Sequence, residues 1–142
     1  MQADNVNKPL LTEIDHIAIA VSDLESAISW YKTMFGATVA HREMVVRDGV
    51  EEALLAVADS YIQLISPRQR DSSVAKFLER HGEGIHHVGY RVDSVESTLE
   101  HLREAGARLI DSTGRPGSRG TTVAFVHPRG SFGTLIELVE VH

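Results

Sequence analysis

The sequence predicts an α+β fold built from two successive modules, each with one strand, one helix and three further strands. The pattern of elements runs once through the first half of the chain and begins again near residue 85. The strand that opens at His16 has a counterpart at His87, 71 residues later, and Ile62-Gln63-Leu64 returns 74 residues later as Ile136-Glu137-Leu138. A duplication this regular predicts two modules related by a pseudo-twofold axis.

The first module opens with a strand, because 14–21 is a dense run of β-branched and other apolar residues. Ser22-Asp23 then provides a helix N-cap, and Gly36 follows the last apolar residue of the helix. Apolar residues recur at helical spacing between them, at Leu24, Ala27, Ile28, Tyr31 and Phe35. Three strands are predicted to follow, at 38–44, 53–58 and 61–65.

The second module repeats this order after a connection at 67–84, which contains a short helix capped by Asp71-Ser72-Ser73. A strand is predicted at 85–92, and a helix that begins after Asp93-Ser94 and ends at Gly106. Glycine and proline at 112–120 predict a loop. The remaining strands are predicted at 108–110, 121–127 and 134–141.

The chain of 142 residues fits one domain, which we place at 12–142. Within it we expect modules at about 12–66 and 85–141, joined by 67–84, and a flexible N-terminus at 1–11.

Composition excludes several classes of protein. The chain carries a formal net charge of −6, which is unfavourable for binding nucleic acid or an anionic membrane surface. It has no cysteine, so disulfides and thiolate metal sites are excluded. Its apolar stretches are too short to span a membrane, and its first residues lack the apolar core of a signal peptide. We therefore expect a cytoplasmic protein.

Four polar residues occupy strand interiors, where polar groups need partners. They are two duplicated pairs, His16 with His87 and Gln63 with Glu137. If the modules are related by a twofold axis, these side chains converge and form a nitrogen and oxygen ligand set for a divalent cation. The alternative for each residue alone is a backbone hydrogen bond or a solvent-facing position. We assign the neighbouring Asp15 and His86 to the outer face of their strands.

The same segments resemble the vicinal oxygen chelate superfamily and, within it, the methylmalonyl-CoA epimerase family. The resemblance covers about 12–141. It rests on the opening strand Ile14–Val21 and on Gly49-Val50-Glu51-Glu52-Ala53, Tyr61-Ile62-Gln63-Leu64, Asp71–Leu78, Gly82–His87 and Phe125-Val126-His127-Pro128. It implies two tandem βαβββ modules that form a curved mixed sheet around a central metal cleft.

The resemblance also implies roles for individual residues. The metal ligands are expected to be His16, Gln63, His87 and Glu137, around a divalent ion, with Co²⁺ as first choice and Mn²⁺, Ni²⁺ or Zn²⁺ as alternatives. Glu137 and Glu52 are expected to be the two catalytic acids. Glu51 is the less favoured candidate, because neighbouring strand residues face opposite ways.

The implied activity is the interconversion of (2R)- and (2S)-methylmalonyl-CoA through a metal-stabilised enolate, in propionate and branched-chain catabolism. The implied partners are methylmalonyl-CoA and a second copy of the chain in a homodimer. A glyoxalase-type lyase or isomerase, an extradiol dioxygenase and a non-enzymatic small-molecule-binding protein remain alternatives. The coenzyme A moiety needs local basic groups, for which the chain offers Lys76, Arg80, Arg115, Arg119 and Arg129.

Overall fold

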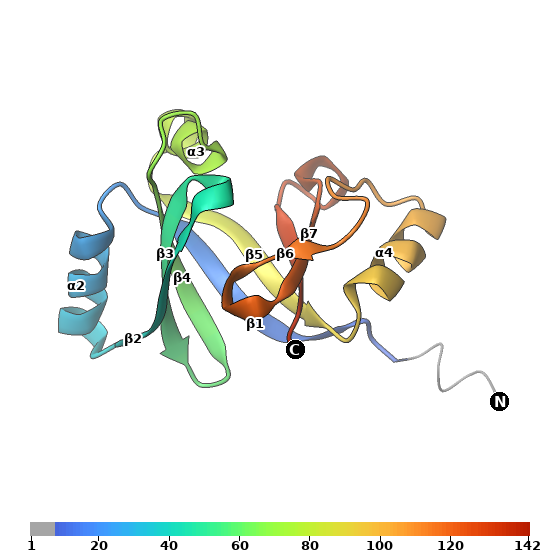
Figure 1. Ribbon diagram of the computed structural model, residues 1–142, viewed down its shortest axis with the longest axis horizontal. Helices are drawn as coiled ribbons and strands as arrows, with labels where there is room; N and C mark the ends of the chain where they lie inside the picture. The colour runs from blue at the N-terminus through green and yellow to red at the C-terminus, as the bar shows by residue number, and fades with distance from the viewer. Residues whose placement is uncertain (1–7) are drawn as a thin grey trace. The chain divides into compact units, whose positions relative to one another are not determined.

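The computed structural model describes residues 8–142, and it contains the two modules that the sequence predicts (Figure 1). Most of the predicted flexible N-terminus, 1–7, lies outside the described residues. The first module consists of β1 (Leu11–Ala20), α2 (Leu24–Phe35), β2 (Val39–Val45), β3 (Val50–Val57) and β4 (Ser60–Pro67). After α3 (Ser73–His81), the second consists of β5 (Gly84–Val92), α4 (Val95–Glu104), β6 (Arg115–Pro116), β7 (Thr122–Val126) and β8 (Ile136–Glu140).

The strands form a mixed sheet with the hydrogen-bonded order β2-β3-β4-β1-β5-β8-β7-β6. The β1–β4 pair is parallel, whereas the β2–β3, β3–β4, β6–β7 and β7–β8 pairs are antiparallel. The predicted α+β class is therefore confirmed. By their internal contacts, Asp15–Val88 form one compact unit, and Gly89–His142 together with residues 8–14 form another.

The helices begin where the sequence places their caps. Asp23 accepts a hydrogen bond from the backbone N of Ser26 at 3.1 Å, and Ser72 and Ser94 cap α3 and α4 in the same way. Gly36 ends α2 in the left-handed conformation, with φ 68°. In the described residues, no helix has both the length and the apolar character needed to cross a membrane.

In the unit Asp15–Val88, α2 packs on one face of the strands (Figure 1). Its contacts involve buried strand residues such as Ala53, Leu55 and Leu64. The helix α3 packs with a second cluster, formed by Ala18, Ala20, Val50, Ile65 and Val74. The polar residues described below share the strand face of the second cluster, because Gln63 is level with Ala18 and two residues from Ile65.

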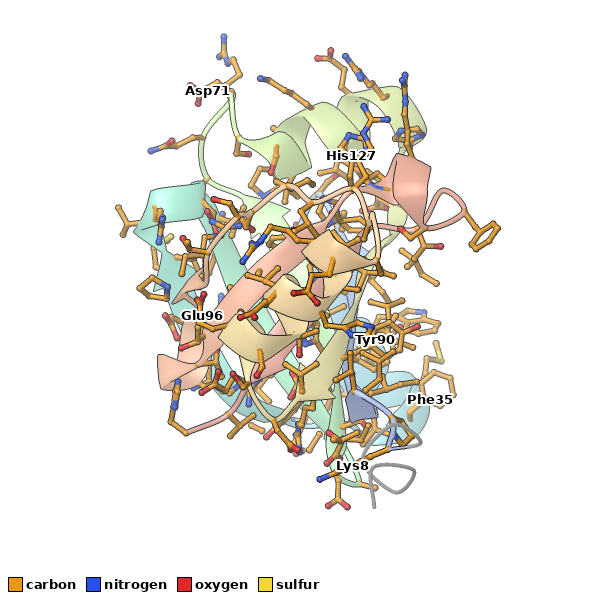
Figure 2. The ribbon with its side chains drawn as sticks, turned by 90° about the vertical axis from the view of Figure 1, so that its right-hand side faces the viewer. Lys8, Phe35, Asp71, Tyr90, Glu96 and His127 are labelled. Atoms are coloured by element: carbon orange, nitrogen blue, oxygen red, sulfur yellow. The ribbon has the colours of Figure 1, made fainter. Side chains whose placement is uncertain are left out.

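In the unit that contains Gly89–His142, α4 packs against β7 and β8. Its core includes Leu99, Ala124 and Leu138. Glu96 at the start of α4, labelled in Figure 2, accepts a hydrogen bond from the backbone N of Gly114 at 2.8 Å and so ties the following loop to the helix.

One predicted strand is wrong. The segment 108–110 forms only an isolated bridge, between Leu109 and Val126, and β6 lies instead inside the predicted loop. The Asp111 carboxylate accepts a hydrogen bond from the backbone N of Phe125 at 2.8 Å. A side chain thus takes the place of a backbone acceptor, and the ladder does not continue.

The strand β3 begins three residues before the predicted start. Gly49 turns the chain with φ 64°, and a Cβ there would lie 2.9 Å from Oε1 of Gln69. Val50 then pairs with Pro67, and pairing continues without a break to Val57. Because of this early start, Glu52 lies inside a paired strand rather than at its end.

Candidate active site

The structure brings His16 of β1 and His87 of β5 together within the unit Asp15–Val88. Their Nε2 atoms lie 3.1 Å apart, and the rings meet edge to face at 87°. Both residues are buried, with exposed fractions of 4% and 5%. The Nε2 atoms of the two imidazoles therefore converge.

Each histidine has a neighbour that binds its other ring nitrogen. Asp15 is fully buried, and its Oδ2 lies 2.7 Å from Nδ1 of His16. Nδ1 of His86 lies 2.8 Å from Nδ1 of His87. An ionised carboxylate only accepts hydrogen bonds, so Asp15 holds the proton of His16 on Nδ1 and makes Nε2 the acceptor atom of that ring.

Sequence reasoning missed this role. It assigned Asp15 and His86 to the outer face because they neighbour His16 and His87, and alternation along a strand suggests opposite faces. Asp15 is instead buried and bonded to His16. The available signal was a polar residue immediately before each duplicated histidine.

Gln63 and Glu52 form a second buried pair. The Gln63 amide nitrogen donates to Oε1 of Glu52 at 2.9 Å. These residues are 7% and 3% exposed. The amide oxygen of Gln63 is also buried, and within residues 8–142 it has no hydrogen-bond partner. A buried amide oxygen in that state is costly unless a cation or another donor binds it.

Strand register places these groups on one face of the unit. His16 is level with Tyr61 in the parallel β1–β4 pair, and Gln63 is two residues further along β4. Register partners share a face, as do residues two apart along a strand. Leu54 is level with Gln63 in the β3–β4 pair, and Glu52 is two residues from it. His16, Gln63 and Glu52 thus share one face.

Glu52 has polar neighbours on the adjacent edge strand β2. It is level with Glu43, and His41 Nε2 lies 2.8 Å from Oε1 of Glu43. Candidate ligand atoms of His41, Glu43 and Glu52 all lie within 4.8 Å of one another. The carboxylate of Glu52 therefore lies between an amide donor and a more exposed imidazole–carboxylate pair.

Glu51 faces the other way and has a different environment. Arg42 Nε donates to its Oε2 at 2.8 Å, and Arg68 Nε donates to its Oε1 at 3.0 Å. Hydrogen bonds from Arg68 and then Arg42 lower the pKa of Glu51. Bonds to Glu25 and Glu51 raise the pKa of Arg42. Glu51 is thus an ion-pair residue, committed to two guanidinium groups.

Glu137 lies in the other unit, on β8, where it is level with Phe125 of β7. Its neighbours Ile136 and Leu138 belong to the core under α4, so Glu137 faces the opposite side of the hairpin. Gln63 has the same setting in its own unit, between Ile62 and Leu64 under α2. The two residues are therefore equivalent within their modules.

The basic residues suggested for coenzyme A are spread over both units. Lys76 and Arg80 are exposed on α3. Arg115 lies over the ring of Phe125, 5.2 Å from its centre, and 3.5 Å from the Asp111 carboxylate. Arg119 has a left-handed backbone, with φ 58°, and Arg129 is exposed in the turn after β7.

The donors of the unit Asp15–Val88 fit a divalent cation. Two imidazole Nε2 atoms at 3.1 Å and a buried amide oxygen on the same strand face are ligands that borderline divalent ions accept. The Asp15 carboxylate behind His16 is the arrangement by which proteins orient a metal-binding imidazole.

Comparison with known families agrees with this chemistry. The sequence pattern of the glyoxalase/bleomycin resistance protein/dioxygenase superfamily matches residues 15–125, which is most of the chain. The chain belongs to this superfamily. The superfamily includes metal-dependent enzymes, so the fold and the donor set both favour a metal site.

Within the superfamily, the chain is similar to several epimerases. It is 36% identical over 135 residues to the ethylmalonyl-CoA/methylmalonyl-CoA epimerase of Cereibacter sphaeroides, covering 93% of this chain and all of that one. The crystal structure of methylmalonyl-CoA epimerase from Mycobacterium tuberculosis is 40% identical, with a TM-score of 0.91, over 95% of this chain and 91% of that one. A methylmalonyl-CoA epimerase in complex with methylmalonyl-CoA and NH₄⁺ is 38% identical, with a TM-score of 0.87, over 92% and 94%.

Proposed function

We propose that this chain is a methylmalonyl-CoA epimerase, which removes the proton from the α-carbon of one epimer and returns it on the other face. The observation that carries the proposal is Glu52, a buried carboxylate on the strand face of His16 and hydrogen-bonded to Gln63. The similarity to epimerases over nearly the whole chain supports the same reaction.

The proposal assigns the metal site to His16, His87, Gln63 and Glu137. The first two would bind through Nε2, Gln63 through its amide oxygen and Glu137 through its carboxylate. A divalent cation, when bound, supplies Lewis-acid stabilisation of negative charge on the thioester and carboxylate oxygens of the substrate. Cobalt is our first choice, with Mn²⁺, Ni²⁺ and Zn²⁺ as alternatives.

Inversion requires a base on each face of the α-carbon. We assign one face to Glu52 and the other to Glu137. The Gln63 amide nitrogen holds Oε1 of Glu52 at 2.9 Å, which fixes the direction of that carboxylate. Glu51 is unsuitable because it faces the other way and is ion-paired with Arg42 and Arg68. With one base on each face, the base that deprotonates one epimer is the acid that reprotonates the carbon when the other epimer reacts.

Three further assignments remain predictions from the sequence, namely the homodimer, the cytoplasmic location and the place in propionate and branched-chain catabolism. The proposed substrate carries a bulky coenzyme A moiety. The reacting carbon is at its acyl end, so the coenzyme A moiety extends away from the proposed bases.

The test is proton NMR of one epimer of methylmalonyl-CoA in D₂O, with metal-free protein and with protein loaded with Co²⁺. We expect metal-dependent deuterium incorporation at the α-carbon, together with appearance of the other epimer. The hemithioacetal of methylglyoxal and glutathione serves as the comparison substrate. Turnover of the hemithioacetal alone, by protein whose metal content has been verified, would overturn the proposal in favour of a glyoxalase.

A further inference from the structure

The turn between β7 and β8 carries an unusually exposed aromatic side chain. Phe132 has the highest exposed fraction of the large apolar residues described, at 105%. Exposed apolar rings are unfavourable in water, and a single one at a turn contributes nothing to the core. The ring of Phe132 therefore has no structural use within its own unit.

The backbone at this residue is also strained. Phe132 has φ 59°, a left-handed conformation that aromatic residues rarely adopt and that glycine or asparagine adopts easily. The turn is nevertheless held firmly. Gly133 N donates to the carbonyl of Pro128 at 2.7 Å, and the Ser131 hydroxyl donates to the carbonyl of Thr134 at 2.6 Å. Strain kept in place by surrounding bonds is typical of sites with a function.

One arginine lies on this turn and a second lies against it. Arg129 is exposed within it, and exposed Arg108 lies against it, because a Cβ on Gly130 would come within 3.0 Å of Cβ of Arg108. The backbone N of His127, labelled in Figure 2, donates to the carbonyl of Arg108 at 2.9 Å. Neither arginine forms an ion pair with any carboxylate in residues 8–142. The turn and the adjoining Arg108 thus carry two positive charges without an ion-pair partner in residues 8–142, and the same turn exposes an aromatic ring, on a protein of net charge −6.

This combination suits a nucleotide that carries phosphates. A purine ring stacks on an aromatic face, and guanidinium groups bind phosphate oxygens through two parallel hydrogen bonds. We propose that Phe132, Arg108 and Arg129 form the subsite for the 3′-phosphoadenosine diphosphate end of the acyl-CoA substrate. The inference rests on the proposed function for the identity of that substrate.

The position of the turn on its own hairpin is compatible with this role. Phe132 precedes Glu137 by five residues, a separation of at most about 18 Å along an extended chain. The nucleotide end of coenzyme A is joined to the reacting thioester by a long, flexible pantetheine arm. One hairpin thus offers a proposed catalytic carboxylate on β8 and a nucleotide subsite in the turn before it.

The test compares Phe132→Asn, which removes the ring but tolerates the left-handed backbone, with wild type on two substrates. For methylmalonyl-CoA we expect KM to rise at least about fivefold while kcat is unchanged, because the nucleotide is remote from the reacting carbon. For methylmalonyl-pantetheine, which lacks the nucleotide, we expect no change. Phe132→Tyr should restore the wild-type KM.

The arginines are tested by the double variant Arg108→Gln/Arg129→Gln, with the exposed Arg70→Gln as the control for charge. We expect about a tenfold rise in KM for methylmalonyl-CoA and a weaker dependence of KM on salt. An unchanged KM in this variant and in Phe132→Asn overturns the inference, and so does an equal effect on methylmalonyl-pantetheine.

Calorimetric titration with adenosine 3′,5′-bisphosphate separates this inference from the proposed function. Binding by wild type and loss of binding in Phe132→Asn support the subsite, whether or not the protein turns over methylmalonyl-CoA. Absence of epimerisation together with this binding pattern contradicts only the proposed reaction. Equal binding by wild type and Phe132→Asn, or self-association that depends on Phe132 without nucleotide binding, overturns the subsite.

Discussion

The hairpins β3–β4 and β7–β8 are equivalent parts of the two modules, yet they carry their acids at different positions. In the first hairpin, the middle of β4 holds the amide Gln63, and the acid Glu52 lies on β3. In the second, the middle of β8 holds the acid Glu137, and the position on β7 that corresponds to Glu52 is Val123. Each hairpin therefore supplies one of the two proposed bases, from non-equivalent strands.

The difference shows which features of the site follow from the duplication of the βαβββ module and which do not. Duplication supplies matching strand positions, with aliphatic neighbours packed under a helix on one face and a polar residue on the other. It does not determine which polar group occupies each position. Because a carboxylate and an amide stand at the two equivalent positions, the proposed ligand set has one anionic member, and the second base must come from elsewhere. We assign that second base to Glu52 in the first hairpin.

The largest expected effect comes from Glu52→Gln, which removes one of the two proposed bases and keeps the shape of the side chain. We expect epimerisation to fall by about 10²- to 10⁴-fold, the usual contribution of a general base. Deuterium exchange at the α-carbon should persist for one epimer only, since Glu137 still serves its own face. NMR of each epimer separately in D₂O measures both quantities.

Glu43→Gln is the matched control for that experiment. Glu43 lies level with Glu52 on β2, but it does not bond to Gln63 and is more exposed. It should retain most of the epimerisation rate. Full exchange of both epimers by Glu52→Gln would remove Glu52 from the mechanism.

Gln63→Ala should weaken metal binding and, at the same time, release the carboxylate of Glu52 from its fixed orientation. It removes the amide oxygen assigned to the metal and the amide nitrogen that bonds to Glu52. We expect metal affinity to fall by at least about 10-fold, the lower end of what loss of an outer partner costs. Competition with a chelating dye measures it, with the exposed Gln69→Ala as control. An unchanged affinity would contradict the ligand role of Gln63.

Most of the fold was predictable because each α-helix of the described residues has a capping residue and an apolar period, and each module repeats the other. The segment 108–110 was not predictable, because the Asp111 side chain replaces a backbone acceptor there. Asp15 was missed because alternation alone predicts an outward side chain. The exposed Phe132 was missed for a different reason, since a sequence pattern does not reveal that a turn residue has a left-handed backbone.

Asp15→Asn tests whether the residue behind His16 acts through the imidazole. Asparagine can still accept a hydrogen bond from Nδ1, but it lacks the charge that favours the proton there. We expect metal affinity to fall by about 10-fold, with a smaller effect on KM than on metal loading. The dye competition and the metal content of purified protein measure this. A variant that folds and binds metal like wild type would reduce Asp15 to a packing role.

The smallest expected effect comes from Glu51→Gln, on the opposite face from Glu52. The bonds from Arg68 and Arg42 lower the pKa of Glu51, so the ionised form stabilises the folded state. That contribution is fully present above the ordinary glutamate pKa and is lost as pH falls through the lowered value. Because the arginines are partly exposed, we expect a loss of no more than about 1 kcal/mol in the free energy of unfolding near pH 7. Urea unfolding at two pH values measures it, and the difference from wild type should shrink in acid. The epimerisation rate should not change, and a loss comparable to that of Glu52→Gln would make Glu51 the base and place the reaction on the other face of the strands.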